Sequence, residues 1–389
     1  MTAPLPTGST IGILGGGQLG RMLSVAASRL GFKTAIFEPG GDCPASHVAN
    51  YHHQASYDDI KALEHFGNSV DVLTYEFENI PTEALDALDQ IRPIRPGREA
   101  LRISQDRLTE KTFLRDIGLQ TAPFATVDDA ASLAQAIETI GTPSILKTRR
   151  FGYDGKGQAR LTKPEDADTA LAELQGAPAV LEGFVDFTCE ISVIAARGTD
   201  GRVAAFDPGQ NVHEGGILRT TTVPAALPNR TLTDAVLTAG KILNALDYIG
   251  VLGVEFFVTP GGLIVNEIAP RVHNSGHWTQ NGCVVDQFEQ HIRAVAGWPL
   301  GDGSRHSELP RTCPQERSRT PKRAEFSRCG ISDRTQPGPR AAHPHPRPRA
   351  AHPRAWTAHQ LVQLQGSKDK RKSVQLYGHT DYATAMYTS

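Results

Sequence analysis

Two glutamates twelve positions apart have the residue type and spacing for metal chemistry. Glu255 and Glu267 flank a segment in which apolar runs lie on both sides of Pro260, Gly261 and Gly262. This pattern predicts two strands joined by a tight turn, and a turn centred on Gly261 places the two carboxylates directly across the hairpin. Like charges that face each other destabilise a sheet, so the pair needs a cation between them. Oxygen ligands suit Mg²⁺ or Mn²⁺, which bridge to substrate phosphates. The alternative interpretation is that the two glutamates are solvated residues at the ends of the hairpin and bind no metal.

A second candidate is a charged, glycine-rich loop over residues 147–158. It holds three glycines and four cationic side chains and follows a short apolar segment at residues 144–148. Such a loop can fold over phosphates and neutralise them, although its glycine spacing differs from that of a Walker loop. A solvated charged loop is the alternative. Together with a dicarboxylate cation site, the loop indicates a nucleotide-phosphate enzyme.

Polar side chains crowd the segment that follows the second glutamate. They are Arg271, His273, Asn274, Ser275 and His277. So many hydrogen-bonding groups beside a cation predict a pocket for a polar, anionic substrate. His273 alone is equally compatible with a structural histidine.

The N-terminal region carries a glycine pattern that has more than one interpretation. Gly15, Gly17 and Gly20 fit GxGxxG between a predicted strand and helix, and Glu38 follows 18 residues after Gly20. By pattern this is a dinucleotide fingerprint with Glu38 on a ribose, which makes an NAD-dependent dehydrogenase an alternative function. The same helix N-terminus can hold any phosphate, and a purely structural turn remains open.

Hydrophobic periodicity predicts an α/β protein of three domains and a tail. Predicted strands cover residues 10–14, 34–37, 70–75, 144–148, 179–182 and 190–196, and predicted helices cover residues 18–31, 60–66, 81–88, 105–117, 165–174 and 230–246. The alternation over the first hundred residues predicts a doubly wound parallel sheet. We place the domains at residues 1–125, 126–205 and 206–305, with a tail over residues 306–389.

Charge and composition separate the tail from the rest of the chain. The 389 residues have a formal net charge of -2, but residues 1–300 carry -11 and residues 301–389 carry +9. Residues 301–354 contain 11 Arg and 9 Pro, and so few apolar side chains predict disorder. A basic tract can contact nucleic-acid phosphates, but no interleaved aromatic residues or known module supports that function.

The location expected from the sequence is the cytoplasm. Five scattered cysteines form no CxxC pair, which predicts free thiols in a reducing compartment. The N-terminus lacks a signal-peptide pattern, and no apolar run approaches the roughly 20 residues that span a bilayer. We therefore expect no membrane association.

The chain closely resembles the 5-(carboxyamino)imidazole ribonucleotide synthases, ATP-grasp carboxylases of purine biosynthesis. The resemblance covers about three quarters of the chain. Its motifs lie at residues 15–22, 75–79, 105–107, 147–158, 211–218 and 266–278, and the last is highly specific. It implies an ATP-grasp fold: an N-terminal Rossmann-like domain, a small central lid domain and a C-terminal α+β domain, with ATP clasped between two sheets.

The resemblance also implies a reaction and its partners. ATP phosphorylates bicarbonate to carboxyphosphate, and the amine of 5-aminoimidazole ribonucleotide captures the carboxyl group or released CO₂, so that ADP and phosphate leave. The implied cofactors are ATP with Mg²⁺ or Mn²⁺, and the implied assembly is a homodimer.

Site residues follow from the resemblance position by position. Those implied for ATP are Arg107, Lys147, Gly152, Tyr153, Asp154, Gly155, Lys156, Gly157, Gln158, Glu182, Gly183, Phe184, Val185, Glu190, His213, Asn266 and Glu267. Those implied for the ribonucleotide or carboxyphosphate are Gly17, Gln18, Leu19, Glu76, Tyr153, Asp154, Arg271, His273 and Asn274. Lys156, Arg271, His273 and Asn274 are the implied catalytic residues, and Glu255 and Glu267 are the implied metal ligands. The resemblance also implies that the glycine loop over residues 15–20 binds the phosphate of the ribonucleotide and is a phosphate seat.

The match ends at about Arg305, where the family continues into a compact β segment with a Gly-Arg-Lys-type motif. The Arg/Pro-rich tract replaces it, and only residues 376–378 resemble the family's ending. A shifted reading frame and a lineage-specific extension are two explanations. A nucleotide-binding pseudoenzyme is the alternative function that this tail leaves open.

Overall fold

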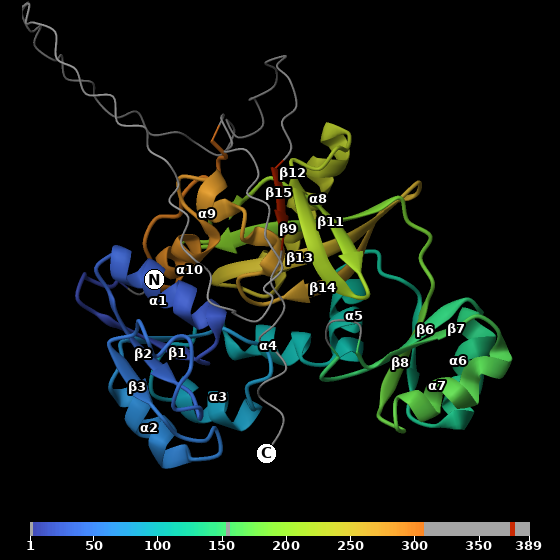
Figure 1. The fold of residues 1–389 in the computed structure, drawn as a ribbon, viewed down its shortest axis with the longest axis horizontal. Coiled ribbons are helices and arrows are strands. Elements are labelled where there is room, and N and C mark those ends of the chain that lie inside the picture. Colours follow the sequence, from blue (N-terminus) through green and yellow to red (C-terminus); the bar gives the residue numbers. More distant parts are fainter. Residues whose placement is uncertain (1–2, 153–155, 307–373, 378–389) are drawn as a thin grey trace, which may run out of the picture. The chain divides into compact units, whose positions relative to one another are not determined.

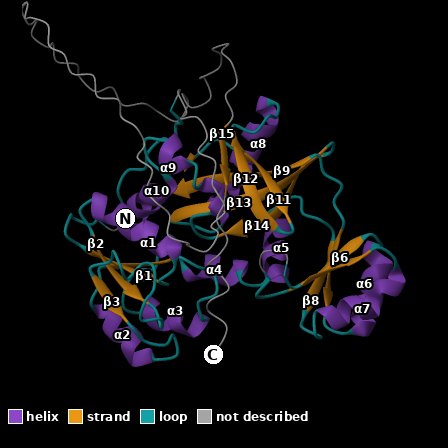
Figure 2. Cartoon of the chain, viewed as in Figure 1, coloured by secondary structure: helices purple, strands orange, loops and turns teal. Residues whose placement is uncertain are grey.

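The computed structural model describes residues 3–152, 156–306 and 374–377 (Figure 1). Three sheets organise these residues, and helices accompany each of them (Figure 2). The first sheet is N-terminal, the second is small and central in sequence, and the third is the largest.

A four-stranded parallel sheet forms the N-terminal part, in the order β3-β2-β1-β4. Its elements are β1 (Thr10–Leu14), α1 (Gln18–Arg29), β2 (Lys33–Phe37), β3 (Tyr51–His53), α2 (Ile60–Asn68), β4 (Val72–Tyr75) and α3 (Thr82–Asp89). β1 and β4 are buried along almost their whole length, which explains their continuous apolar runs. The predicted parallel sheet is confirmed, and the short strand β3 was missed.

Two helices lead from this sheet to the lid, α4 (Arg98–Ser104) and α5 (Arg107–Asp116). Asp106 begins α5 because its carboxylate accepts hydrogen bonds from Leu108 N and Thr109 N. The lid is a four-stranded antiparallel sheet in the order β5-β8-β6-β7, with α6 and α7 beside it (Figure 1). Its elements are β5 (Phe124–Val127), α6 (Ala130–Ile140), β6 (Ser144–Thr148), β7 (Gln158–Leu161), η1 (Pro164–Asp166), α7 (Ala167–Glu173) and β8 (Ala179–Gly183).

The third sheet has seven strands and carries the paired glutamates. Its path is β14-β13-β9-β11-β12-β15, and β10 pairs with β9. Its elements and their helices are β9 (Cys189–Arg197), β10 (Val203–Ala205), β11 (Gly209–Glu214), β12 (Ile217–Val223), α8 (Asn229–Ala245), β13 (Gly250–Thr259), β14 (Gly262–Ala269), η2 (Asn274–Gly276), α9 (Thr279–Gly282), α10 (Gln287–Val295) and β15 (Val374–Tyr377).

The placement of β9 corrects the expected domain boundary at residue 206. β9 lies between β13 and β11 and pairs with β13 along residues 189–197, so it belongs to the large sheet rather than to residues 126–205. The lid sheet ends at Gly183. A continuous apolar run suits the middle of the large sheet, where Ile191 to Ala196 are all buried.

A shared core joins the N-terminal sheet to the large sheet. Leu23 of α1 and Ile292 of α10 belong to one buried cluster with Val251 of β13. At the same junction, the Thr74 hydroxyl lies 2.8 Å from His291 Nε2, and Val251 N donates to His291 Nδ1 at 3.1 Å. These contacts hold the ends of β4 and β13 together.

The tail differs in two places from the expectation of disorder. Residues 301–306 are held in place, since His306 N donates to Gly282 O and Gly301 N to Gln290 Oε1, both at 2.8 Å. β15 pairs antiparallel with β12, with Leu376 opposite Thr221. The remaining residues of the expected disordered segment, and Gly378, lie outside the described residues.

Candidate active site

The two glutamates of the hairpin face each other as predicted, for a different reason. Two residues, Pro260 and Gly261, join β13 to β14, and this turn alone would set Glu255 opposite Asn266. A bulge shifts the register at that point, so Glu255 pairs with Glu267. Burial, followed by the charge of Glu267, raises the pKa of Glu255. The hairpin therefore holds an uncompensated carboxylate that a cation would stabilise.

Arg107 links the hairpin to the lid. Its guanidinium pairs with Glu182 on β8 and lies 3.2 Å from both Glu267 Oε2 and Asn266 Oδ1. Lys147 on β6 donates to Glu182 Oε2 at 3.2 Å. Burial raises the pKa of Glu182, but Arg107 and the neighbouring lysines outweigh it and hold that pKa well below its usual range. Five residues implied for ATP thus form one charged network.

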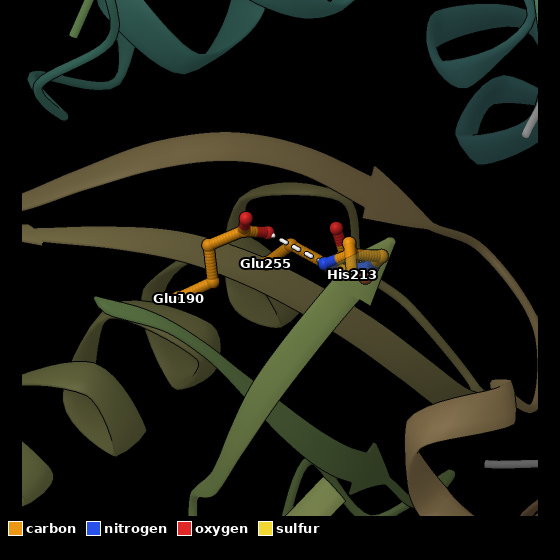
Figure 3. A group of neighbouring side chains, drawn as sticks. All are labelled: Glu190, His213 and Glu255. Carbon is orange, nitrogen blue, oxygen red and sulfur yellow. Dashed lines mark ion pairs between the residues drawn. The ribbon is translucent and has the colours of Figure 1, made fainter. Parts of the chain in front are cut away.

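A second group lies on the large sheet, where Glu190, His213 and Glu255 come from three different strands. Each offers a ligand atom, and these atoms all lie within 4.8 Å of one another. His213 Nδ1 lies 2.8 Å from Glu190 Oε2, and Figure 3 shows these two side chains pointing toward each other. Burial lowers the pKa of His213, but the contact with Glu190 outweighs it and raises that pKa overall. Glu255 therefore connects this group to the hairpin pair.

His273, in the polar segment that follows β14, also contacts Glu255. His273 Nε2 lies 3.6 Å from Glu255 Oε1, and His273 Nδ1 lies 2.8 Å from Ser275 Oγ. Gln287, wholly buried at the start of α10, accepts from His273 N at 3.0 Å and donates to His273 O at 2.8 Å. Burial lowers the pKa of His273 to about 3. Gln287 is a supporting residue that sequence analysis missed, because nothing local marks it.

Arg271 forms a bidentate pair with Glu78. Two of its guanidinium nitrogens contact the two carboxylate oxygens, at 3.0 Å for Nη2 and Oε1. This pairing fixes the guanidinium plane. Glu78 was not among the predicted site residues, although it lies two positions from Glu76 in the same motif. Asn274, three residues after Arg271, is the first residue of η2.

The glycine loop of the N-terminal sheet is occupied by carboxylates of the chain itself. Glu76 accepts from Gly17 N and, at 2.8 Å, from Gly20 N. Glu38 accepts from Gly16 N at 3.1 Å, so it stabilises the turn instead of binding a ribose as the dinucleotide interpretation expected. The amides of Gly16, Gly17 and Gly20 are thus already bonded to carboxylates of the chain, and the phosphate seat implied for this loop stays a prediction. Gln18 is exposed and Leu19 half-buried at the start of α1.

The lid loop is closed at its base by the pairing of β6 with β7. Lys147 pairs with Gln158, and Thr148 N donates to Gly157 O at 2.8 Å. Gly152 and Lys156 are exposed, whereas Tyr153, Asp154 and Gly155 lie outside the described residues. The other residues implied for adenine follow Glu182 directly in sequence, at the end of β8 and just after it. They are Gly183, the exposed Phe184 and the half-buried Val185.

The residues present fit a divalent cation. Glu255 and Glu267 supply oxygen donors from facing strands, and the raised pKa of Glu255 marks a charge that the protein alone leaves uncompensated. Such donors suit Mg²⁺ or Mn²⁺.

Among the described residues, no helix has the length and apolar character to cross a membrane.

A parallel N-terminal sheet, a small antiparallel lid and a large sheet joined through a buried charge network define an ATP-grasp enzyme. Two family models match: the ribonucleotide synthetase preATP-grasp domain over residues 8–105 and the ATP-grasp domain over residues 112–288. An N5-carboxyaminoimidazole ribonucleotide synthase of Brucella melitensis is 56% identical over 307 residues, 78% of this chain and 85% of the relative. The chain belongs to the N5-carboxyaminoimidazole ribonucleotide synthase family.

Solved structures agree with this assignment. An N5-carboxyaminoimidazole synthetase of Staphylococcus aureus complexed with ADP has a TM-score of 0.74 and 40% identity, and the match covers 77% of this chain and 80% of the other. A synthase of Aspergillus clavatus in complex with ADP and 5-aminoimidazole ribonucleotide has a TM-score of 0.72 and 31% identity, with 77% and 79% covered. These comparisons support neither the dehydrogenase nor the pseudoenzyme alternative.

Proposed function

We propose that the charge network around Arg107 binds ATP with Mg²⁺ for the reaction of this ligase family. The chain catalyses the ATP-dependent conversion of 5-aminoimidazole ribonucleotide to N5-carboxyaminoimidazole ribonucleotide. One observation carries the assignment of the site: Arg107 contacts Glu182 on the lid and Glu267 on the large sheet at once. A cation in that position can contact a phosphate chain lying between the two sheets.

The proposal assigns the nucleotide roles implied by the family resemblance to these residues. Arg107, Lys147 and Lys156 neutralise the phosphates, and the loop over residues 152–158 closes over them. Residues 182–185 contact the adenine, and Glu190, held by His213 at 2.8 Å, binds the ribose. Structures of relatives with ATP or ADP support a nucleotide site in this fold.

Glu255 and Glu267, with Asn266 beside them, would hold the metal ion. When bound, Mg²⁺ neutralises charge on the phosphate oxygens. Mn²⁺ has the same preference for oxygen donors and could replace it. The Arg107 guanidinium then stays near Glu267 as a second positive charge, which favours phosphoryl transfer by positioning and neutralisation.

The acceptor side comprises Gln18, Glu76, Tyr153, Asp154, Arg271, His273 and Asn274. A bicarbonate oxygen attacks the γ-phosphorus, the bond to ADP breaks, and carboxyphosphate forms. The exocyclic amine of the ribonucleotide attacks the carboxyl carbon, or CO₂ released from it, and phosphate leaves. The pairing of Arg271 with Glu78 holds the guanidinium in one orientation for an anionic reactant.

ADP release by the purified full chain tests the function. We expect it to require both bicarbonate and 5-aminoimidazole ribonucleotide, with one phosphate released per carboxylated product. Release that is unchanged when both substrates are omitted would contradict the proposal. The homodimer and the cytoplasmic location stay predictions, and sedimentation of the same preparation checks the first.

A further inference from the structure

One face of α5 carries three charged residues that all reach β14. Arg107, Glu110 and Lys111 stand at helical spacings of three and four, which places them on the same face. Glu110 is 3% exposed and Lys111 is 0% exposed. Buried charges are costly unless they are paired and hydrogen-bonded. Their partners therefore show what this face does.

All three side chains bond to the stretch of β14 that contains the bulge. Lys111 Nζ donates to Asn266 O at 2.8 Å, and Ile268 N donates to Glu110 Oε1 at 2.6 Å. Arg107 Nη2 donates to Asn266 Oδ1 at 3.2 Å. The helix thus holds the backbone on both sides of Glu267.

The bulge makes these bonds necessary. N–H groups that point to the same edge of a strand recur every second residue. On β14, Val265 N donates to Gln120 O at 2.8 Å and Ile268 N donates to Glu110, both away from β13. Val265 and Ile268 are three residues apart instead of two because Asn266 is an extra residue in β14. The backbone groups that the bulge leaves unpaired within the sheet need partners outside it.

We infer that Glu110 and Lys111 are positioning residues that hold the bulge at Asn266 and so set the register in which Glu267 faces Glu255. Without the bulge, Asn266 would stand opposite Glu255 and the second carboxylate would be lost from the pair. This inference rests on the proposed metal site at Glu255 and Glu267. We place neither residue in contact with the metal or the substrate.

Lys111 also reaches the lid. Its Nζ lies 3.6 Å from Glu182 Oε2 as well as 2.8 Å from Asn266 O. One buried ammonium group therefore contacts a strand on each side of the proposed nucleotide. A purely structural role in the core needs no such charge, since apolar residues of similar volume often replace buried ion pairs without loss of stability.

Mn²⁺ binding in the presence of ADP, followed by electron paramagnetic resonance, tests the inference without turnover. We expect Lys111→Met and Glu110→Leu to weaken Mn²⁺ binding about tenfold to a hundredfold, as supporting residues of metal ligands do. Glu110→Gln keeps an oxygen that accepts from Ile268 N, so binding should stay within about threefold of the wild type. Rescue by the glutamine separates positioning from simple loss of stability.

Glu289→Leu is the matched control, because Glu289 is a buried carboxylate on α10 whose ion-pair partners are Arg293, at 2.9 Å from Nε, and Arg29 of α1. It should lower the melting temperature and leave Mn²⁺ affinity unchanged. All variants are compared where circular dichroism shows them folded, and if Lys111→Met does not fold, the two Glu110 variants decide.

The outcomes separate the two proposals. If Glu267→Gln binds Mn²⁺ like the wild type, the proposed metal site is wrong. If Glu267→Gln loses Mn²⁺ while Lys111→Met and Glu110→Leu bind it normally, the site stands and the positioning role is overturned. Equal weakening by Glu110→Gln and Glu110→Leu would also overturn it.

Discussion

The glycine loop and the β13–β14 hairpin each bring two carboxylates together, but the partners of these carboxylates differ. In the loop, Glu38 and Glu76 accept hydrogen bonds from backbone amides of the same turn. In the hairpin, Glu255 faces Glu267 across two strands, and its pKa is raised. Burial raises the pKa of Glu76 as well, but hydrogen bonds from Gly20 N and Gly17 N partly offset that rise. At Glu255 the charge of Glu267 adds to the effect of burial, so the hairpin is the less compensated of the two.

The difference shows why the more familiar pattern was the weaker guide to function. A glycine pattern at a helix N-terminus supplies free amides only if no side chain of the protein reaches them. Facing carboxylates remain costly until a cation arrives. The hairpin is therefore the region whose chemistry requires a ligand.

Glu267→Gln should have the largest effect. Removing this charge leaves the metal one carboxylate and Arg107 one ion-pair partner fewer, so kcat/KM for ADP release should fall at least about a hundredfold. Initial rates over a range of Mg²⁺ concentrations measure this. Glu214→Gln, an exposed β11 carboxylate paired with Arg219 at 3.6 Å, is the control and should change the rate less than about twofold. Normal turnover by Glu267→Gln would remove the hairpin from the mechanism.

The junction that joins the two regions should make the protein sensitive to acid. Burial lowers the pKa of His291 to about 3, so the unfolded chain takes up a proton below pH about 6.5 that the folded chain does not. Stability from this group is complete above pH 6.5 and is lost as the pH falls toward 3. Between pH 6.5 and 5 the loss should be about 2 kcal/mol.

Urea unfolding of the wild type and His291→Gln at both pH values measures this contribution. Glutamine does not titrate, so the variant should lose about 2 kcal/mol less over this interval. Equal losses in the two proteins would show that His291 is protonated in the folded state.

Glu38→Gln should have the smallest effect and sharpens the contrast directly. Glu38 accepts hydrogen bonds from Gly16 N and Gly40 N, both at 3.1 Å. Glutamine keeps one acceptor oxygen, so one of these two bonds is lost, at a cost of about 1 kcal/mol in the free energy of unfolding. ADP release should stay within about twofold of the wild type, because the carboxylate serves the turn. A severe loss of activity at unchanged stability would place Glu38 in the reaction instead.

Much of this arrangement could be predicted from the sequence, where local patterns determine it. Three of the four strands of the parallel sheet, and the facing of Glu255 and Glu267, were predicted from apolar runs and a turn. The bulge at Asn266 that sets this facing was not, because its partners Glu110 and Lys111 lie about 155 residues earlier. Periodicity counts apolar residues, so a helix face that buries charge gives no signal.

Other errors have the same origin in long-range contacts. β9 was assigned to the central domain because it follows the lid in sequence, although it pairs with β13 and β11. Glu182 was expected at the adenine, and sequence could not show that it also neutralises Arg107 and Lys147. Strand β15 comes from a tail whose composition predicted no structure at all.

A crystal structure of the chain with ADP and Mg²⁺ tests the central claim most directly. The account predicts one metal ion with an oxygen of Glu255 and an oxygen of Glu267 in its coordination sphere at about 2.1 Å, and with Arg107 still beside Glu267. A metal ion bound to the nucleotide that contacts neither carboxylate would contradict it.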